Sequence, residues 1–126
     1  MQRQMLKSKI HRATVTDCDV DYVGSITIDT ELMAGADLLT NEQVHVWDVD
    51  NGERFVTYVI EGEAGSGAMQ VNGAAAHLVE PGHKIIVASF GAYDEADLER
   101  YAPVVVHVSA DNTPIAIDDR PEVLVA

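Results

Sequence analysis

The sequence predicts a small, mainly β domain. Apolar and polar residues alternate with a period of two along most of the chain, turn signals separate short apolar runs, and only a few short segments have a helical pattern. A chain of 126 residues has the length of one ordinary domain, and no linker or internal repeat divides it. Many short strands with little helix indicate a closed barrel or a sandwich, and the pattern alone favours neither.

The first half of the chain begins with two strands and a short helix. A first strand is expected within residues 5–16, and a second covers residues 25–28. Asp29 or Thr30 can cap the helix that follows over residues 31–34, because a side-chain oxygen at that position accepts a free backbone N–H.

A β-hairpin is the clearest local prediction. Residues 44–49 and 55–60 alternate as strands and flank Asn51-Gly52, a dipeptide that readily adopts the two positive φ angles of a type I′ turn. The remaining expected elements are a loop at 65–67, a strand at 69–71, a helical turn at 74–77, a turn at Pro81-Gly82, a strand at 85–90, an acidic helix at 94–101 and a strand at 104–108. The tail from Asp111, with Pro114 and Pro121, has weak periodicity and is expected to be mobile or to dock on a neighbour.

Composition excludes several classes of function. The net charge of −13 argues against nucleic acid as a partner, because phosphate binding needs a basic surface. No apolar stretch approaches the ~20 residues that span a bilayer, so no membrane partner is expected. The single cysteine, Cys18, excludes an internal disulfide and suits a reducing cytoplasm.

The few cations are unevenly distributed. Four of the eight Lys and Arg residues fall in the first twelve positions, where no acid occurs. Lys7, Lys9 and His11 alternate, so a regular strand puts them on one face. Such a basic patch would be needed to attract a dicarboxylate to an acidic protein, and the alternative is a solvated N-terminal arm.

Gly24-Ser25 carries the most specific chemical hypothesis. A serine hydroxyl can attack the preceding carbonyl, and glycine tolerates the strained backbone that this attack needs. The resulting ester can cleave by β-elimination, which leaves dehydroalanine and, after hydrolysis, a pyruvoyl group. The ordinary interpretation of Gly-Ser is a turn, which is what Gly65-Ser66 indicates.

Motifs on both sides of this dipeptide raise the specificity of that hypothesis. They are, in order, Lys9-Ile10-His11-Arg12, Tyr22-Val23-Gly24-Ser25, Val46-Trp47, Asn51-Gly52, Arg54-Phe55-Val56-Thr57-Tyr58 and Asn72-Gly73-Ala74-Ala75-Ala76-His77. This pattern closely resembles the aspartate 1-decarboxylase family, pyruvoyl enzymes that make β-alanine from L-aspartate. The resemblance runs from about residue 1 to residue 90, and little beyond Phe90 is diagnostic.

The resemblance implies a specific architecture and cofactor. The implied fold is a small six-stranded double-psi β-barrel with short helices, assembled into a cytoplasmic homotetramer with active sites between subunits. Cleavage between Gly24 and Ser25 would give chains of residues 1–24 and 25–126, the longer one capped by a covalent pyruvoyl group derived from Ser25. L-Aspartate would form a Schiff base with that group before losing CO₂, and the β-alanine would feed pantothenate synthesis. A helper protein for this maturation stays an open question.

The resemblance also implies roles for individual residues. Tyr58 matches the proton donor, Lys9 and Arg54 match carboxylate-binding cations, and Thr57 matches the residue that polarises the Gly24 carbonyl and contacts substrate. The substrate and processing pocket matches Asn72, Gly73, Ala74 and Ala75. Tyr22, His11 and Trp47 match surrounding positions to which no chemical step is assigned.

Each role has a structural alternative. Tyr58 can pack in the core, Arg54 can form a surface ion pair with Glu53 or Asp50, and Thr57 can reflect β-propensity alone. Asn72-Gly73 can be a tight turn and nothing more. Arg54 and Tyr58 lie four residues apart, so a strand places both on one face, with Thr57 on the other.

Two rival functions fit the same sequence features, whereas a metal site does not. The rivals are a pyruvoyl decarboxylase of another acidic amino acid, such as glutamate, and a double-psi barrel that binds or assembles without cleaving itself. The five histidines show neither His-x-His nor His-x-x-x-His spacing, so no metal is expected.

Overall fold

The chain is mainly β, as the sequence predicts. The computed structural model describes residues 1–120, which contain nine strands where six were expected. The strands are β1 (Arg3–Thr14), β2 (Asp17–Asp19), β3 (Ser25–Asp29), β4 (Gln43–Asp48), β5 (Arg54–Gly62), β6 (Met69–Asn72), β7 (Lys84–Tyr93), β8 (Val104–Val108) and β9 (Pro114–Asp118). The helices are α1 (Thr30–Gly35), the 3₁₀ helix η1 (Gly73–His77) and α2 (Glu95–Leu98). None of these helices is long or apolar enough to cross a membrane.

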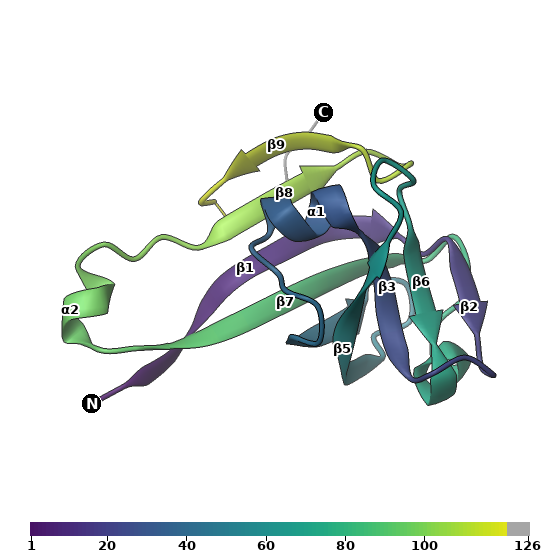
Figure 1. Cartoon of the computed structure of the whole chain (residues 1–126), viewed down its shortest axis with the longest axis horizontal. Coiled ribbons are helices and arrows are strands. Elements are labelled where there is room, and N and C mark those ends of the chain that lie inside the picture. The colour runs from purple at the N-terminus through teal and green to yellow at the C-terminus, as the bar shows by residue number, and fades with distance from the viewer. Residues whose placement is uncertain (121–126) are drawn as a thin grey trace.

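The strands form one mixed sheet in the order β2-β6-β3-β5-β4-β7-β1-β8-β9. Three pairs are parallel, namely β1 with β8, β3 with β5 and β2 with β6, and the other neighbours are antiparallel. Figure 1 shows β1 and β7 as long adjacent strands, with β8 and β9 beyond β1 and with β3, β6 and β2 at the other end of the sheet. This is an open sheet with β2 and β9 at its edges, so the expected double-psi barrel is not confirmed.

A single aliphatic core lies on one face of the sheet. Ile10, Ile26, Val46, Val59 and Ile85 have no exposed surface, and each comes from a different strand. Their neighbours along each strand point to the opposite face, because successive residues in a strand alternate. The core therefore fixes which side chains of β3, β4, β5 and β7 face away from it.

The predicted hairpin is confirmed, but its turn type was wrong. β4 and β5 pair antiparallel, with Trp47 opposite Arg54. Within the turn only Gly52 has a positive φ, of 79°, whereas a type I′ turn also requires one at Asn51. The Asp48 carboxylate accepts the backbone N–H of Asn51 at 3.3 Å, which stabilises a longer loop over residues 49–52.

The predicted helix after β3 is confirmed with Asp29 as its cap. The Asp29 carboxylate accepts the Glu31 N–H at 2.8 Å, and it also accepts the N–H groups of Gly65 at 3.1 Å and Gly67 at 2.8 Å. Because Asp29 is almost fully buried, these three bonds satisfy a carboxylate that would otherwise be costly.

The expectation of a mobile C-terminal tail was wrong up to residue 120, docking of the tail on a neighbour stays a prediction, and Pro121 lies outside the described residues. β9 follows the turn after β8 and pairs with it antiparallel. Ile117 contacts the position where Gly35 would carry a Cβ, at 3.2 Å, so the tail packs on the end of α1. The three-residue strand β2 was also missed, because Asp17-Cys18-Asp19 has no strand-forming residues beyond one half-buried cysteine.

Candidate active site

Ser25 is the first residue of β3, and it pairs with Asn72 at the end of β6. Its side chain has no exposed surface. The Ser25 hydroxyl donates a hydrogen bond to the Val23 carbonyl at 2.8 Å and accepts one from the Asn72 amide at 3.1 Å. The hydroxyl oxygen is therefore held next to the bond that precedes it, with a donor directed at it.

Asn72 is fixed by two further residues that the sequence reasoning missed. Its Nδ2 also donates to the Thr27 hydroxyl at 3.0 Å, and its Oδ1 accepts from Gln70 Nε2 at 2.7 Å. Thr27 and Gln70 lie two residues from Ser25 and Asn72 on paired strands, so strand alternation was the signal that could have found them. The amide orientation is set by this network.

Gly73, rather than Gly24, is the glycine that the geometry requires. Gly73 has a φ of +76°, and a Cβ placed on it would lie 2.5 Å from Gly24 Cα. By contrast, a Cβ on Gly24 would meet nothing within 4 Å, and Gly24 does not have a positive φ. The role of Gly24 in the attack stays a prediction, whereas the close approach of the two segments depends on Gly73.

The residues around the Gly24–Ser25 bond are open to solvent on one side. Tyr22 is 50% exposed and Val23 is 64% exposed, while Ser25 is buried. Ala74 is exposed and Ala75 is half-buried at the start of η1, directly after Gly73. The bond therefore lies between a buried nucleophile and an exposed loop.

Thr57 and Tyr58 lie on β5 just before the point where it pairs with β3. Val59 pairs with Ile26, the residue after Ser25, in the parallel β3–β5 ladder. Tyr58 precedes Val59 and therefore faces away from the core, on the face that Ser25 also takes. Thr57 pairs with the buried Val44 and takes the opposite face, as its sequence position predicts.

Arg54 does not form the ion pair that the alternative interpretation required. No ion pair joins it to Glu53 or Asp50, and its guanidinium carbon lies 5.2 Å from the centre of the Trp47 ring. Such a cation over an aromatic face is held in place while its N–H groups stay available for a carboxylate.

Lys9 lies on the same face of the sheet as Arg54, three strands away. Lys9 pairs with Ala88, Ala88 pairs with His45, and His45 pairs with Val56, two residues after Arg54. Lys9 is 9% exposed, and burial lowers its pKa. A partly desolvated ammonium binds an anion more strongly than a fully hydrated one.

The basic patch expected at the N-terminus is only partly formed. Lys7 Nζ is bound by Glu42 at 2.6 Å, so its charge is neutralised. His11 is 7% exposed, and neither ring nitrogen has a hydrogen-bond partner. Burial, followed by the charges of Lys9 and His107, lowers the pKa of His11 to about 4, so it is neutral at pH 7.

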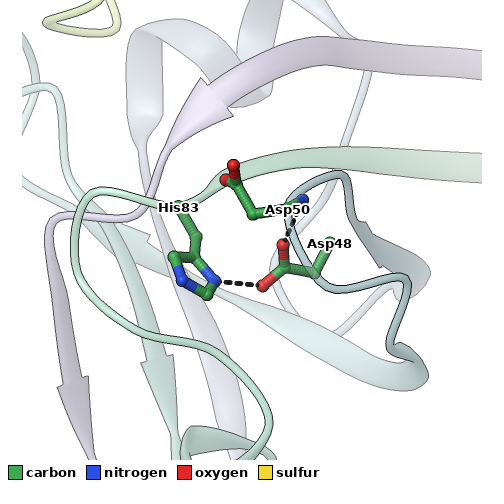
Figure 2. Close-up of side chains that lie close together, drawn as sticks. All are labelled: Asp48, Asp50 and His83. Carbon is green, nitrogen blue, oxygen red and sulfur yellow. Dashed lines mark hydrogen bonds and ion pairs between the residues drawn. The ribbon is translucent and has the colours of Figure 1, made fainter.

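Among residues 1–120, one group has the spacing of a metal site. Asp48, Asp50 and His83 bring three ligand atoms within 4.8 Å of one another (Figure 2). Their atoms already have partners, because His83 Nδ1 bonds Asp48 at 2.6 Å and Asp50 accepts the Lys84 N–H at 2.6 Å.

A separate cavity of about 560 Å³, lined by Gln4, Glu42, Gln43, His45 and Phe90, includes none of the predicted site residues.

The mainly β fold and the buried serine next to an exposed loop are those of a small β enzyme, a class that the comparisons define more closely. A sequence model of the aspartate decarboxylase family matches residues 1–115. The chain is 56% identical to the aspartate 1-decarboxylase of Mycolicibacterium smegmatis over 121 residues, which cover 96% of this chain and 89% of that protein. The chain belongs to the aspartate decarboxylase family, and the match extends past the Phe90 limit of the recognisable motifs.

Proposed function

We propose that this chain is an aspartate 1-decarboxylase that converts L-aspartate to β-alanine and CO₂, a step that supplies pantothenate synthesis. The family match and the 56% identity to a named aspartate 1-decarboxylase support this function. The observation that carries the mechanism is the buried Ser25 hydroxyl, held by the Asn72 amide beside the Gly24–Ser25 bond.

The first reaction is on the chain itself. Ser25 Oγ attacks the Gly24 carbonyl carbon, the C–N bond breaks, and Gly24 becomes esterified to the serine oxygen. Loss of the Ser25 α-proton then expels the Gly24 carboxylate, which divides the chain into residues 1–24 and 25–126. Hydrolysis of the remaining dehydroalanine releases ammonia and leaves the pyruvoyl group. By resemblance to the family, Thr57 polarises the Gly24 carbonyl; in sequence it lies two residues before Val59, the partner of Ile26.

The pocket around Ser25 suits a pyruvoyl group. Gly73 carries no Cβ where one would collide with Gly24, so the segments pack closely while the small residues Ala74 and Ala75 leave backbone N–H groups approachable. When formed, the pyruvoyl group supplies the electron sink that decarboxylation of an amino acid needs. Asn72 orients the side chain of residue 25 through its amide, whose own orientation is fixed by the bond to Thr27.

The remaining residues bind substrate and move a proton. Arg54 can hold one carboxylate bidentately, and Lys9 adds a second cation on the same face. Tyr58 precedes Val59, the partner of Ile26, and we assign to it the proton that replaces the lost carboxyl group. A phenol hydroxyl is a strong enough acid for a carbanionic centre.

Assembly would complete the site. Arg54 is four residues from Tyr58, about 13 Å along β5 at ~3.3 Å per residue, and Lys9 is three strands away. These separations exceed the length of an L-aspartate molecule. We therefore propose that Lys9 and Arg54 bind the substrate that reacts at Ser25 of another copy in a cytoplasmic homotetramer. The parallel β1–β8 and β3–β5 pairs, between strands distant in sequence, support a double-psi barrel within the larger sheet.

Turnover with two substrates tests the function. CO₂ release is expected from L-aspartate and not from L-glutamate, and the Ser25→Ala variant is expected to fold, stay uncut and release none. Preference for glutamate would reassign the substrate, and β-alanine formation by Ser25→Ala would refute the role of Ser25. A permanently intact, inactive wild-type chain would indicate the non-catalytic barrel instead.

A further inference from the structure

The turn between β4 and β5 is held to a second turn by a hydrogen-bonded pair, in which Asp48 is buried and His83 is partly exposed. The Asp48 side chain has no exposed surface, and its Oδ2 lies 2.6 Å from His83 Nδ1 (Figure 2). Its other oxygen accepts the backbone N–H groups of Asp50 at 2.8 Å and Asn51 at 3.3 Å. We name this Asp48–His83 pair the clasp.

Two backbone bonds lie beside the clasp and join the same segments. Val49 N–H donates to the Lys84 carbonyl at 2.8 Å, and Lys84 N–H donates to Asp50 at 2.6 Å. Removing His83 would leave one oxygen of a fully buried carboxylate without its partner. An unpaired buried charge is costly, so the turn would rearrange to hydrate Asp48.

The clasp is adjacent to Arg54, the residue proposed to bind a substrate carboxylate. Asp48 follows Trp47, and Asp48 N–H bonds the carbonyl of Glu53, the residue before Arg54, at 2.9 Å. Trp47 and Arg54 are directly opposite in the β4–β5 ladder and in cation–π contact. A displacement of Asp48 therefore moves the backbone on both sides of the Trp47–Arg54 pair.

We infer that His83 is a positioning residue, which through Asp48 holds Trp47 and Arg54 in the geometry that binds the substrate carboxylate. This inference rests on the proposed role of Arg54. Neither residue of the clasp touches substrate, so its loss should weaken binding more than it slows the chemical step.

The clasp should also respond to pH. Its hydrogen bond to Asp48 raises the pKa of His83, and the nearby charges of Asp50 and Glu80 act in the same direction. Within residues 1–120, two other carboxylates lie near the ring: Glu80, which is 3.6 Å from Nε2 and 80% exposed, and Asp50, which has a ligand atom within 4.8 Å of those of Asp48 and His83. As pH rises through the raised pKa, the imidazolium becomes neutral and the charge pair weakens.

Fluorescence and kinetics together test the inference. Trp47 is the sole tryptophan, so its emission reports the clasp directly, even in the uncut Ser25→Ala protein. In the Ser25→Ala protein, the Trp47 emission should change in a step as pH rises. The additional His83→Asn substitution should abolish this step. The control substitution His45→Asn in the same protein should leave it in place. In the processed enzyme, His83→Ala should raise KM for L-aspartate about fivefold with kcat within about twofold. His83→Asn keeps a hydrogen-bond donor near the position of Nδ1, so its KM should be close to that of the unaltered enzyme.

The controls separate the clasp from general damage. Glu80→Gln alters an exposed neighbour in the same turn and should leave KM within about twofold of the unaltered value. An identical Trp47 titration with and without His83, or an unchanged KM in His83→Ala, would overturn the inference. A wild-type chain with no decarboxylase activity would refute the proposed function, while the Trp47 readout in the uncut protein would still decide the clasp.

Discussion

Replacing Gly73 with alanine should separate folding from self-processing. The new Cβ would lie 2.5 Å from Gly24 Cα, whereas ordinary contact begins near 3.4 Å, so the two segments must move apart by about 0.9 Å. Alanine at a φ of +76° costs about 1–2 kcal/mol, and forcing the segments apart costs about 1–3 kcal/mol more. At about 3–5 °C per kcal/mol for a domain of this size, the midpoint of thermal unfolding should fall by roughly 6–25 °C.

The same displacement should slow cleavage much more than it lowers stability. A misplacement of about 1 Å in a reacting pair can cost about 100-fold in rate, and Gly24 carries the carbonyl that Ser25 must attack. The cut fraction should be followed by intact mass over time, at a temperature well below the unfolding midpoint of the variant.

Gly82→Ala is the matched control for this variant. Gly82 has a φ of +91°, but a Cβ there meets nothing within 4 Å. It should lose about 1–2 kcal/mol of stability and cleave at the unaltered rate. Equal cleavage rates in Gly73→Ala and Gly82→Ala would refute the claim that Gly73 sets the approach to Gly24.

Four further predictions follow from individual contacts. Tyr58→Phe should cleave normally but lose about 100-fold or more of its β-alanine formation, and a processed variant with normal turnover would exclude Tyr58 as the donor. Asn72→Ala should slow cleavage at least about tenfold, measured by intact mass, because Ser25 loses its donor. Asn112→Ala should lower the free energy of unfolding by about 2–4 kcal/mol in denaturant titrations, since its buried side chain makes three hydrogen bonds to backbone groups and its φ is +65°. The raised pKa of His83 means that its stabilising effect is complete below about pH 6.5 and is lost as pH rises through the raised value, so the stability difference from His83→Asn should shrink as pH rises above about 6.5.

Local patterning predicted most of the elements because their causes are local. Alternation predicts β4 and β5, and a capping aspartate predicts the start of α1 at Thr30. β9 escaped prediction because it is an edge strand whose Ile115 and Ile117 are both more than half exposed. Its position depends on backbone pairing with β8, which no local pattern encodes.

The candidate site was predictable as a set of residues but not as a geometry. The sequence motifs around Ser25 and Asn72 predicted which residues form the pocket. The pairing of β3 with β6 then brings Ser25 and Asn72 together. The requirement for glycine was assigned to Gly24, yet it applies to Gly73, because only the packed structure shows which Cβ would collide. The Asp48–His83 clasp joins residues 35 positions apart, and no spacing rule reveals it.

The most direct measurement is the intact mass of the purified protein after prolonged incubation, with and without a hydrazine-type carbonyl reagent. Two fragments divided between Gly24 and Ser25 are expected. The larger should be lighter by one ammonia than residues 25–126. It should gain the mass of one reagent molecule minus one water, because the ketone condenses to a hydrazone. A single uncut chain that never reacts with the reagent, or a larger fragment that still begins with serine, would contradict self-processing at Ser25.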